Sequence, residues 1–203
     1  MEKIPVLFET RYDDYGRYLG ISDQVREGFE WVLSGEGTAT EKIDGSACAV
    51  INGEFYKRYD AKKGKTPPPG AIPCCDPDPV TGHWPHWVRV DFGSKADKWL
   101  ASAYETTMSG NPVAKDVLRG SAYITMEAFG KHFNGNPYGA EGDRLTPHGM
   151  VKIDLQDRSY NGIKEYLRTH EIEGIVFWKD KKPQCKIRRK DFGFPWPAKE
   201  EEK

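Results

Sequence analysis

The sequence lacks the features that would place it in a membrane, in a disulfide-stapled fold or among strongly basic proteins. No apolar run approaches the ~20 residues that a membrane-spanning helix needs. Residues 1–20 carry several charges and no apolar central segment of a secretory signal, so we expect no leader peptide and a cytoplasmic location. Four cysteines among 203 residues are too few to predict a disulfide framework. The formal net charge is −1, so overall charge does not point to nucleic acid.

The composition is that of an ordinary globular domain, with 30% charged and 37% hydrophobic residues. A chain of 203 residues can bury one sizeable core and leaves little room for a second. We therefore predict one domain over residues 1–197, followed by a disordered, Glu-rich tail at 198–203.

Positive charge is concentrated near the C-terminal end. Residues 179–190 contain a single acid, Asp180, and seven cations: Lys179, Lys181, Lys182, Lys186, Arg188, Arg189 and Lys190. Such a cluster favours an edge that faces a polyanion, although a solvated strand and turn has the same composition.

Turn signals divide the chain into short elements. Residues 37–50 and 55–59 flank Asn52-Gly53, the dipeptide of a two-residue hairpin, which predicts that Lys42 stands at the start of an antiparallel hairpin. Residues 60–92 are rich in Pro and Gly and predict a long loop with little regular structure. Other patterns predict helices at 94–108 (N-cap Ser94) and 160–169 (N-cap Ser159), and strands at 123–129, 150–155, 172–178 and 184–189.

The tetrapeptide Lys42-Ile43-Asp44-Gly45 is the motif most relevant to function. A Lys-x-Asp-Gly sequence arises by chance in roughly one window in several thousand, so its context has to decide. Three further features follow it in order: Glu127, then Glu173-Gly174-Ile175-Val176, then Lys186-x-Arg188.

This order resembles the covalent nucleotidyltransferase superfamily of ligases and capping enzymes, in which a lysine carries the nucleotide. Blocks at 40–50, 134–139, 147–149 and 172–197 are similar to the chordate-type 5′-to-3′ RNA ligase family, the RNA ligase 1 group. The resemblance implies an α+β nucleotidyltransferase fold, unrelated to ATP-grasp, with mixed or antiparallel sheets around an ATP cleft and no OB domain. It makes residues 1–197 the adenylyltransferase domain.

The resemblance also implies an activity. The chain would be a monomeric, ATP-dependent RNA ligase that uses Mg²⁺ or Mn²⁺ to join 5′-phosphate and 3′-hydroxyl RNA ends through AMP carried on Lys42. DNA ligase and mRNA guanylyltransferase are alternatives, but these usually carry a C-terminal OB domain. A non-catalytic nucleotide- or RNA-binding module and a protein AMPylating enzyme are alternatives of other classes.

The cations have the chemistry that this activity needs. A lysine amine attacks phosphorus only when neutral, and the reference pKa of lysine is about 10.4. Lys186 and Arg188 could lower that pKa for Lys42 and bind the α- and β-phosphates as pyrophosphate leaves. The alternative is that they are alternate exposed residues of one strand.

The carboxylates suit a hard divalent cation. Glu127 and Glu173 lie near the ends of apolar strands, where a carboxylate is costly unless it is paired or binds metal. The resemblance implies that Glu173 helps to coordinate the catalytic metal and that Glu127 contacts the ribose or supports metal binding. Solvated strand-end glutamates are the alternative. Arg58 stands where the family has an arginine that touches the ribose or a phosphate, and a plain hairpin arginine is its alternative.

The nucleotide would contact the remaining motif residues. Thr40 and Glu41 can offer backbone groups to the adenine edge. Gly45 allows close approach of the nucleotide, and Asp44 holds the loop through local hydrogen bonds. Val176 is the aliphatic side of the base site. Residues 150–154 lack the aromatic that the family pattern has on the other side, so His148 is the substitute candidate.

The long loop contains two further candidates. Cys74, Cys75, His83 and His86 are potential zinc ligands, although adjacent cysteines lack the usual spacing of ligand pairs. Trp84, Trp87 and Trp99 could stack on nucleic-acid bases or anchor the loop to the core.

Overall fold

The structure, a computed structural model, describes residues 3–110, 115, 116, 118 and 120–197. Its chain divides into two compact units, Asp44–His148 with Met1–Lys3 and Ile4–Ile43 with Gly149–Lys203. The single domain over 1–197 stays a prediction, and the predicted tail at 198–203 lies outside the described residues. No helix within the described ranges is both long and apolar enough to cross a bilayer.

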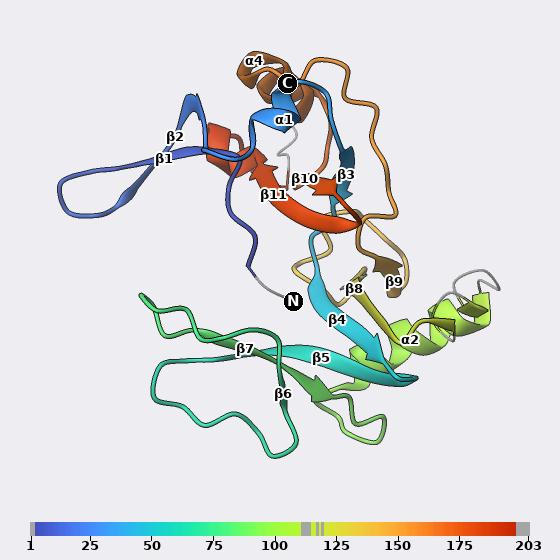
Figure 1. The fold of residues 1–203 in the computed structure, drawn as a ribbon. Helices are drawn as coiled ribbons and strands as arrows, with labels where there is room; N and C mark the ends of the chain where they lie inside the picture. Colours follow the sequence, from blue (N-terminus) through green and yellow to red (C-terminus); the bar gives the residue numbers. More distant parts are fainter. Residues whose placement is uncertain (1–2, 111–114, 117, 119, 198–203) are drawn as a thin grey trace. The chain divides into compact units, whose positions relative to one another are not determined.

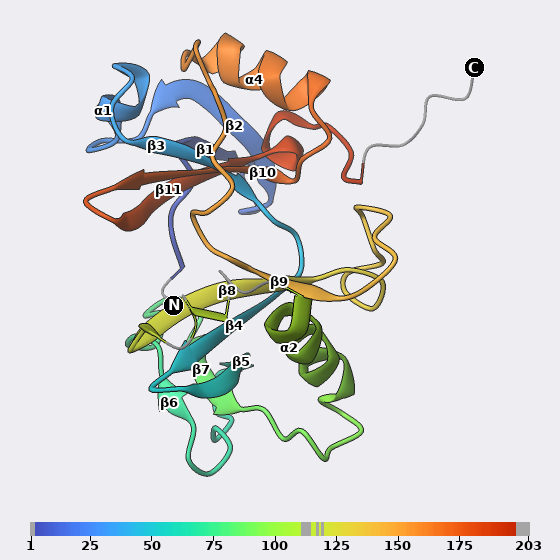
Figure 2. The ribbon, with the colours of Figure 1, turned by 90° about the vertical axis from the view of Figure 1, so that its right-hand side faces the viewer.

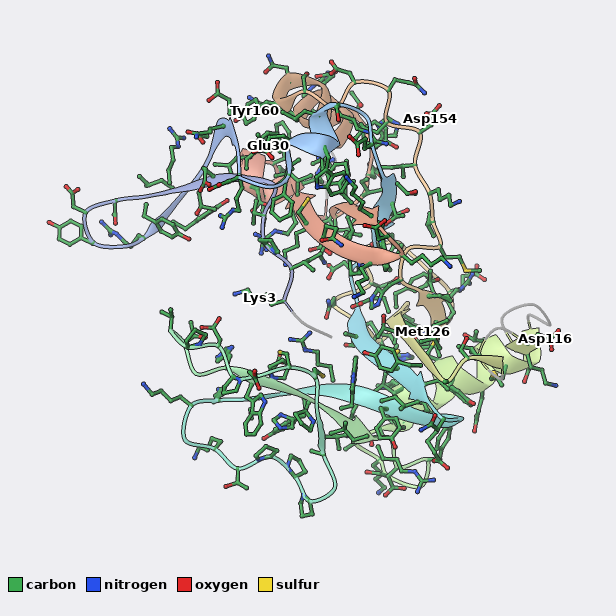
Figure 3. All side chains as sticks on the ribbon, viewed as in Figure 1. Lys3, Glu30, Asp116, Met126, Asp154 and Tyr160 are labelled. Carbon is green, nitrogen blue, oxygen red and sulfur yellow. The ribbon has the colours of Figure 1, made fainter. Side chains whose placement is uncertain are left out.

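The first unit contains a six-stranded antiparallel sheet in the order β6-β7-β5-β4-β8-β9. One helix, α2 (Lys98–Gly110), contributes Ala103 to the buried apolar cluster of this unit. Met126, labelled in Figure 3, is fully buried in that cluster. The strands, drawn in Figure 1, are β4 (Ser46–Ile51), β5 (Glu54–Ala61), β6 (Ile72–Pro73), β7 (Trp84–Arg89), β8 (Tyr123–Phe129) and β9 (Arg144–Pro147).

The β4–β5 hairpin confirms one prediction and corrects another. Asn52 and Gly53 form its turn with φ of 49° and 82°, a pair of positive values that Asn-Gly tolerates well. Lys42, however, does not belong to this hairpin. It ends β3 (Thr38–Lys42), which pairs with β10 in the other unit, so residues 37–50 form two strands in two sheets.

The prediction of little regular structure over residues 60–92 is wrong for β6 and β7. β7 pairs along its whole length with β5, from Tyr56 opposite Arg89 to Ala61 opposite Trp84. Trp87 and His86 of this strand are buried. Proline disfavours a central strand, so Pro85 predicts a loop here. The segment forms a strand nevertheless, because it pairs with β5 and buries these two rings.

The second unit contains a three-stranded sheet, β11-β10-β3, and a separate hairpin of β1 and β2, all with antiparallel pairing between the named strands. Apolar side chains of both sheets and of α4 form one buried cluster. Figure 2 shows α4 running along one face of the three-stranded sheet. The other elements are β1 (Phe8–Tyr12), β2 (Tyr18–Val25), α1 (Glu30–Leu33), α4 (Tyr160–Thr169), β10 (Gly174–Lys179), β11 (Lys182–Arg188) and the 3₁₀ helix η1 (Arg189–Phe192).

Local signals predict α4 well. The side chain of Ser159 accepts a hydrogen bond from the backbone N–H of Gly162, the N-cap contact that the sequence predicts. Tyr160, labelled in Figure 3, begins the helix, and Ile163 and Leu167, one turn apart, are buried.

Two other predicted elements need correction. Residues 150–155 do not form a strand, because only an isolated bridge joins Lys152 to Thr40. The strand of this region lies earlier, as β9. The helix predicted at 94–108 begins at Lys98, since Ser94 caps a preceding turn through the backbone N–H of Ala96. With these changes, antiparallel sheets and separate helices agree with the α+β class.

Candidate active site

One face of the β3-β10-β11 sheet gathers predicted site residues from three strands. Gly174 pairs with Lys42 on one side and with Arg188 on the other. Residues directly opposite on neighbouring strands project to the same face of a sheet. The side chains of Lys42 and Arg188 therefore share a face. Their Cα atoms are two strand spacings, or about 10 Å, apart, and Gly174 puts no side chain between them.

The next row of the same face contains three more predicted residues. Val176 lies opposite both Thr40 and Lys186, and each of these is two positions from its neighbour in the first row. The intervening residues face the other way, and two of them, Ile175 and Ile187, form part of the buried core, while Glu41 is half-buried. Strand alternation thus separates a polar, cationic face from an apolar one.

Lys42 makes an ion pair with Glu173 on this face. The Lys42 Nζ donates a hydrogen bond to Glu173 Oε2 at 2.5 Å, and the two side chains are 27% and 14% exposed. Glu173 stands directly before β10. The pair places a lysine amine beside a carboxylate that is largely shielded from water.

Arg188 is held by Asp191, a residue that the sequence did not single out. Its Nη2 donates to Asp191 Oδ1 at 2.7 Å and its Nε donates to Oδ2 at 3.0 Å. Burial alone would lower the pKa of Arg188, but the hydrogen bonds and charge of Asp191, with the charge of Glu173, raise it. Arg188 therefore stays a cation in a fixed orientation.

Thr40 and Glu41 are engaged within the second unit. The hydroxyl of Thr40 donates to the Val176 carbonyl at 3.2 Å and accepts from Trp178 Nε1 at 2.9 Å. The backbone N–H of Glu41 donates to the Val151 carbonyl at 2.8 Å, and burial raises the pKa of its side chain. The sequence does not single out Trp178. Its position two residues after Val176 in the same strand predicts that its side chain lies on the same sheet face as Lys42.

Glu127 and His148 meet in the first unit. Glu127 Oε2 lies 2.8 Å from His148 Nε2, and His148 Nδ1 lies 3.0 Å from Thr125 Oγ1. A carboxylate only accepts hydrogen bonds, so in neutral His148 the Nε2 carries the proton and Nδ1 accepts from the threonine hydroxyl. Both ring nitrogens are therefore occupied by side chains of β8.

The turn after Lys42 is held by a distant segment. Asn134 Nδ2 donates to Asp44 Oδ1 at 2.7 Å and to the Gly45 carbonyl at 2.9 Å, while the Asp44 N–H donates to the Tyr138 hydroxyl at 2.7 Å. The sequence predicts local hydrogen bonds for Asp44, and these two contacts come in addition from residues 90 and 94 positions along the chain. The 134–139 block therefore has a structural role, since two of its residues hold the turn that follows Lys42.

Arg58 lies on β5, where its Nε donates to Asp60 at 2.9 Å. It lines a cavity of about 1010 Å³ in the first unit together with Cys74, Cys75 and His83. In the part of the chain that the structure describes, no three His, Cys, Asp or Glu side chains gather in a way that could hold a metal. The zinc alternative therefore has no ligand set there.

The three tryptophans of the long loop and α2 differ in burial: Trp87 is buried, Trp84 half-buried and Trp99 exposed. Trp87 is 2% exposed, and Trp84 Nε1 donates to the Cys75 carbonyl at 2.7 Å. The ring of Trp99 stacks on His132 with centroids 3.3 Å apart, and the ammonium of Lys98 lies 4.2 Å from the Trp99 centroid. These contacts favour the anchoring role over base stacking.

Comparison with known proteins decides the family. No family model matches the chain. RNA ligase 1 of Mus musculus is 30% identical over 221 residues, which cover 78% of this chain and 68% of that protein. The chain belongs to the RNA ligase 1 family. RNA ligase 1 of Rattus norvegicus is 29% identical with the same coverage, and that of Danio rerio is 28% identical over 58% of this chain and 43% of that protein.

The resemblance predicted from the motifs is thus confirmed, and the predicted site residues of this RNA ligase 1 family member fall into two groups. Thr40, Glu41, Lys42, Glu173, Val176, Lys186 and Arg188 belong to the second unit, and Asp44, Gly45, Arg58, Glu127 and His148 to the first. Their individual roles stay predictions. The sequence does not single out Trp178, Asp191 and Thr125, which contact these residues, or Tyr18, which contacts Asp191. Asn134, which contacts Asp44, belongs to the 134–139 block that carries the resemblance.

Proposed function

We propose that this RNA ligase 1 family member is an ATP-dependent RNA ligase that joins 5′-phosphate and 3′-hydroxyl ends. The observation that carries the proposal is the placing of Lys42, Lys186 and Arg188 on one sheet face, with Glu173 at 2.5 Å from the Lys42 amine. A purely binding site needs cations but no such lysine.

The first step is nucleotide transfer to Lys42. The amine loses its proton to solvent, and its nitrogen attacks the α-phosphorus of ATP. A nitrogen–phosphorus bond forms, the bond from the α-phosphorus to the bridging oxygen breaks, and pyrophosphate leaves with the bonding electrons. Lys186 and Arg188 bind the phosphate oxygens and stabilise the charge that develops on the leaving group.

Two further steps complete the proposed ligation. A 5′-phosphate oxygen of RNA attacks the phosphorus of the lysine-bound AMP and frees the lysine. A 3′-hydroxyl then attacks the 5′-phosphate, forms the new phosphodiester bond and releases AMP. Thr40, Glu41 and Val176 would contact the base, with His148 as the candidate stacking residue. Arg58 would touch the ribose or a phosphate, and Glu127 the ribose.

Divalent metal fits the carboxylate chemistry of this chain. Glu173 would supply oxygen donors, as Mg²⁺ and Mn²⁺ require, and Glu127 has the same chemistry. Magnesium typically takes one or two carboxylates together with substrate phosphates and water, so a dedicated protein cage is not required. When bound, the metal would neutralise charge on the phosphate oxygens.

The wild-type protein should become covalently labelled by ATP that carries its label at the α-phosphate. We expect the label to stay on the protein in a denaturing gel, with Mg²⁺ or Mn²⁺ present, because a phosphoramidate bond survives denaturation. Adding 5′-phosphorylated RNA that bears a 3′-hydroxyl should discharge the label and give longer RNA.

Matched acceptors separate the alternatives. Discharge only by 5′-phosphorylated DNA would replace RNA ligase by DNA ligase, and labelling by GTP in place of ATP would indicate a guanylyltransferase. Transfer to a protein acceptor and not to RNA would indicate protein AMPylation. Absence of any label with both metals would leave the binding module as the better description.

A further inference from the structure

The Asp191 carboxylate is buried in the second unit, and its main ion-pair partner is the Arg188 side chain. The Asp191 side chain is 0% exposed, whereas that of Arg188 is 21% exposed. Beyond the two guanidinium contacts, Asp191 Oδ2 accepts the backbone N–H of Arg188 at 2.9 Å. A buried carboxylate needs several such partners to offset its loss of water.

The fourth contact comes from the N-terminal hairpin. The hydroxyl of Tyr18, at the start of β2, donates to Asp191 Oδ1 at 3.1 Å. Burial and the charge of Asp191 raise the pKa of Tyr18 to about 12, so this hydroxyl remains a donor at neutral pH. Asp191, which belongs to η1, is thereby held from two strands, β11 through Arg188 and β2 through Tyr18.

The same N-terminal segment also fixes the other cation of the face. The backbone N–H of Lys186 donates to the Pro5 carbonyl at 3.0 Å, and the N–H of Leu7 donates to the Lys186 carbonyl at 2.8 Å. Residues 5–18, which no site motif includes, therefore support both cationic positions of β11.

Arg188 keeps donor capacity after these contacts. Asp191 takes Nε and one N–H of Nη2, and among the described residues Nη1 has no hydrogen-bond partner. A guanidinium gripped along one edge presents its other edge in a fixed plane, which suits bidentate binding of a phosphate-type anion. Side-chain disorder of the arginine is removed before the ligand arrives.

We infer that Asp191 and Tyr18 are positioning residues that hold Arg188 as a fixed anion-binding fork on the Lys42 face. They act through Arg188 and do not touch the substrate. The inference rests on the proposed function where the anion is identified as a phosphate of the nucleotide.

The test is a double-mutant cycle between Asp191→Asn and Arg188→Lys, with Tyr18→Phe as a milder variant. Two properties are measured for each protein: inorganic pyrophosphate binding by titration calorimetry, and the rate of labelling by α-labelled ATP. We expect Asp191→Asn to weaken pyrophosphate binding about tenfold and Tyr18→Phe about two- to fivefold, as loss of charge-assisted hydrogen bonds typically does. In the Arg188→Lys background, Asp191→Asn should add little, because the fork is already gone.

A structural role of Asp191 would give a different pattern. Its effects would then be the same in both backgrounds, and would follow the melting temperature of the variants. That additive result overturns the inference, as does pyrophosphate binding by Tyr18→Phe and Asp191→Asn equal to wild type. If Asp191→Asn does not fold, Tyr18→Phe is compared in the wild-type and Arg188→Lys backgrounds instead. An effect on pyrophosphate binding that is equal in both backgrounds again overturns the inference.

Failure of the proposed function is recognised separately. It is shown by absence of label on wild type, which the labelling arm reports. The pyrophosphate arm still decides whether Asp191 and Tyr18 act through Arg188, because it requires no turnover.

Discussion

Lys42→Ala will take up no AMP label at any ATP concentration or with either metal, a loss of more than about a thousandfold. The variant lacks the only nitrogen that we propose to attack the α-phosphorus, and water cannot replace it in a step whose product is a covalent protein adduct. Label incorporation measured on a denaturing gel, followed by peptide mapping of the wild-type adduct, checks the result.

The design must separate chemistry from folding. Lys42→Ala also removes the partner of Glu173, which leaves a carboxylate that is only 14% exposed without that ion pair and should cost about 1–3 kcal/mol of stability. Lys42→Arg keeps a positive charge beside Glu173 and should fold better while remaining unlabelled. The control is Lys164→Ala, an exposed lysine of α4, which should label like wild type. Label that persists in Lys42→Arg, or that maps to another lysine, would contradict the assignment.

Gly174→Ala should lower both stability and labelling, although it adds only one methyl group. An added Cβ would collide with the Ile187 carbonyl oxygen and lie 2.9 Å from the Cα of Arg188. Both contacts are to backbone of β11, which cannot move aside without disturbing the sheet. Overpacking of this kind costs about 1–3 kcal/mol. A displacement of Arg188 by about 1 Å would slow adenylylation on the order of a hundredfold.

Urea unfolding and single-turnover labelling of the same preparations measure the two effects. Gly110→Ala is the matched control, because a Cβ there meets no atom within 4 Å. In a helix this change should leave labelling unchanged and stabilise slightly, by up to about 1 kcal/mol. Wild-type labelling by folded Gly174→Ala would show that the close approach of β10 and β11 does not position Arg188.

The elements that the sequence predicts well are those decided by neighbouring residues. Asn52-Gly53 specifies its turn by backbone conformation, and Ser159 specifies the start of α4 by capping. The strand at 123–129 matches β8 at both ends. In each case the deciding interaction lies within a few residues of the element.

The errors concern elements that distant partners create. β7 exists because β5 pairs with it, and β3 is separate from β4 because its partner is β10. A hairpin signal at Asn52-Gly53 says nothing about how far the preceding strand extends. Lys152, within a strand-like sequence, makes only a bridge to Thr40.

The candidate site divides in the same way. Alternation along each strand puts Lys186 beside Arg188 and Thr40 beside Lys42, so the shared face follows once the strands are known. The contacts that hold these side chains do not follow from the strands, because Tyr18 and Asp191 are 173 residues apart in the sequence and Lys42 and Glu173 are 131 apart. Only the folded chain reveals that the aspartate that binds this arginine of the motif also accepts a hydrogen bond from a tyrosine of the first hairpin.

Asn134, which holds the turn after Lys42, is also a site where the stored protein should deamidate. It precedes Gly135, and an asparagine before glycine readily loses its side-chain amide, because the unhindered glycine nitrogen attacks the amide carbon. Deamidation would replace the Nδ2 donor by a carboxylate facing Asp44, where the present distance is 2.7 Å, and the two negative charges would repel. Stored protein should therefore lose labelling activity in step with conversion at this position, measured by peptide mapping. A freshly made Asn134→Asp variant should have the same defect, and full activity of that variant would refute the link.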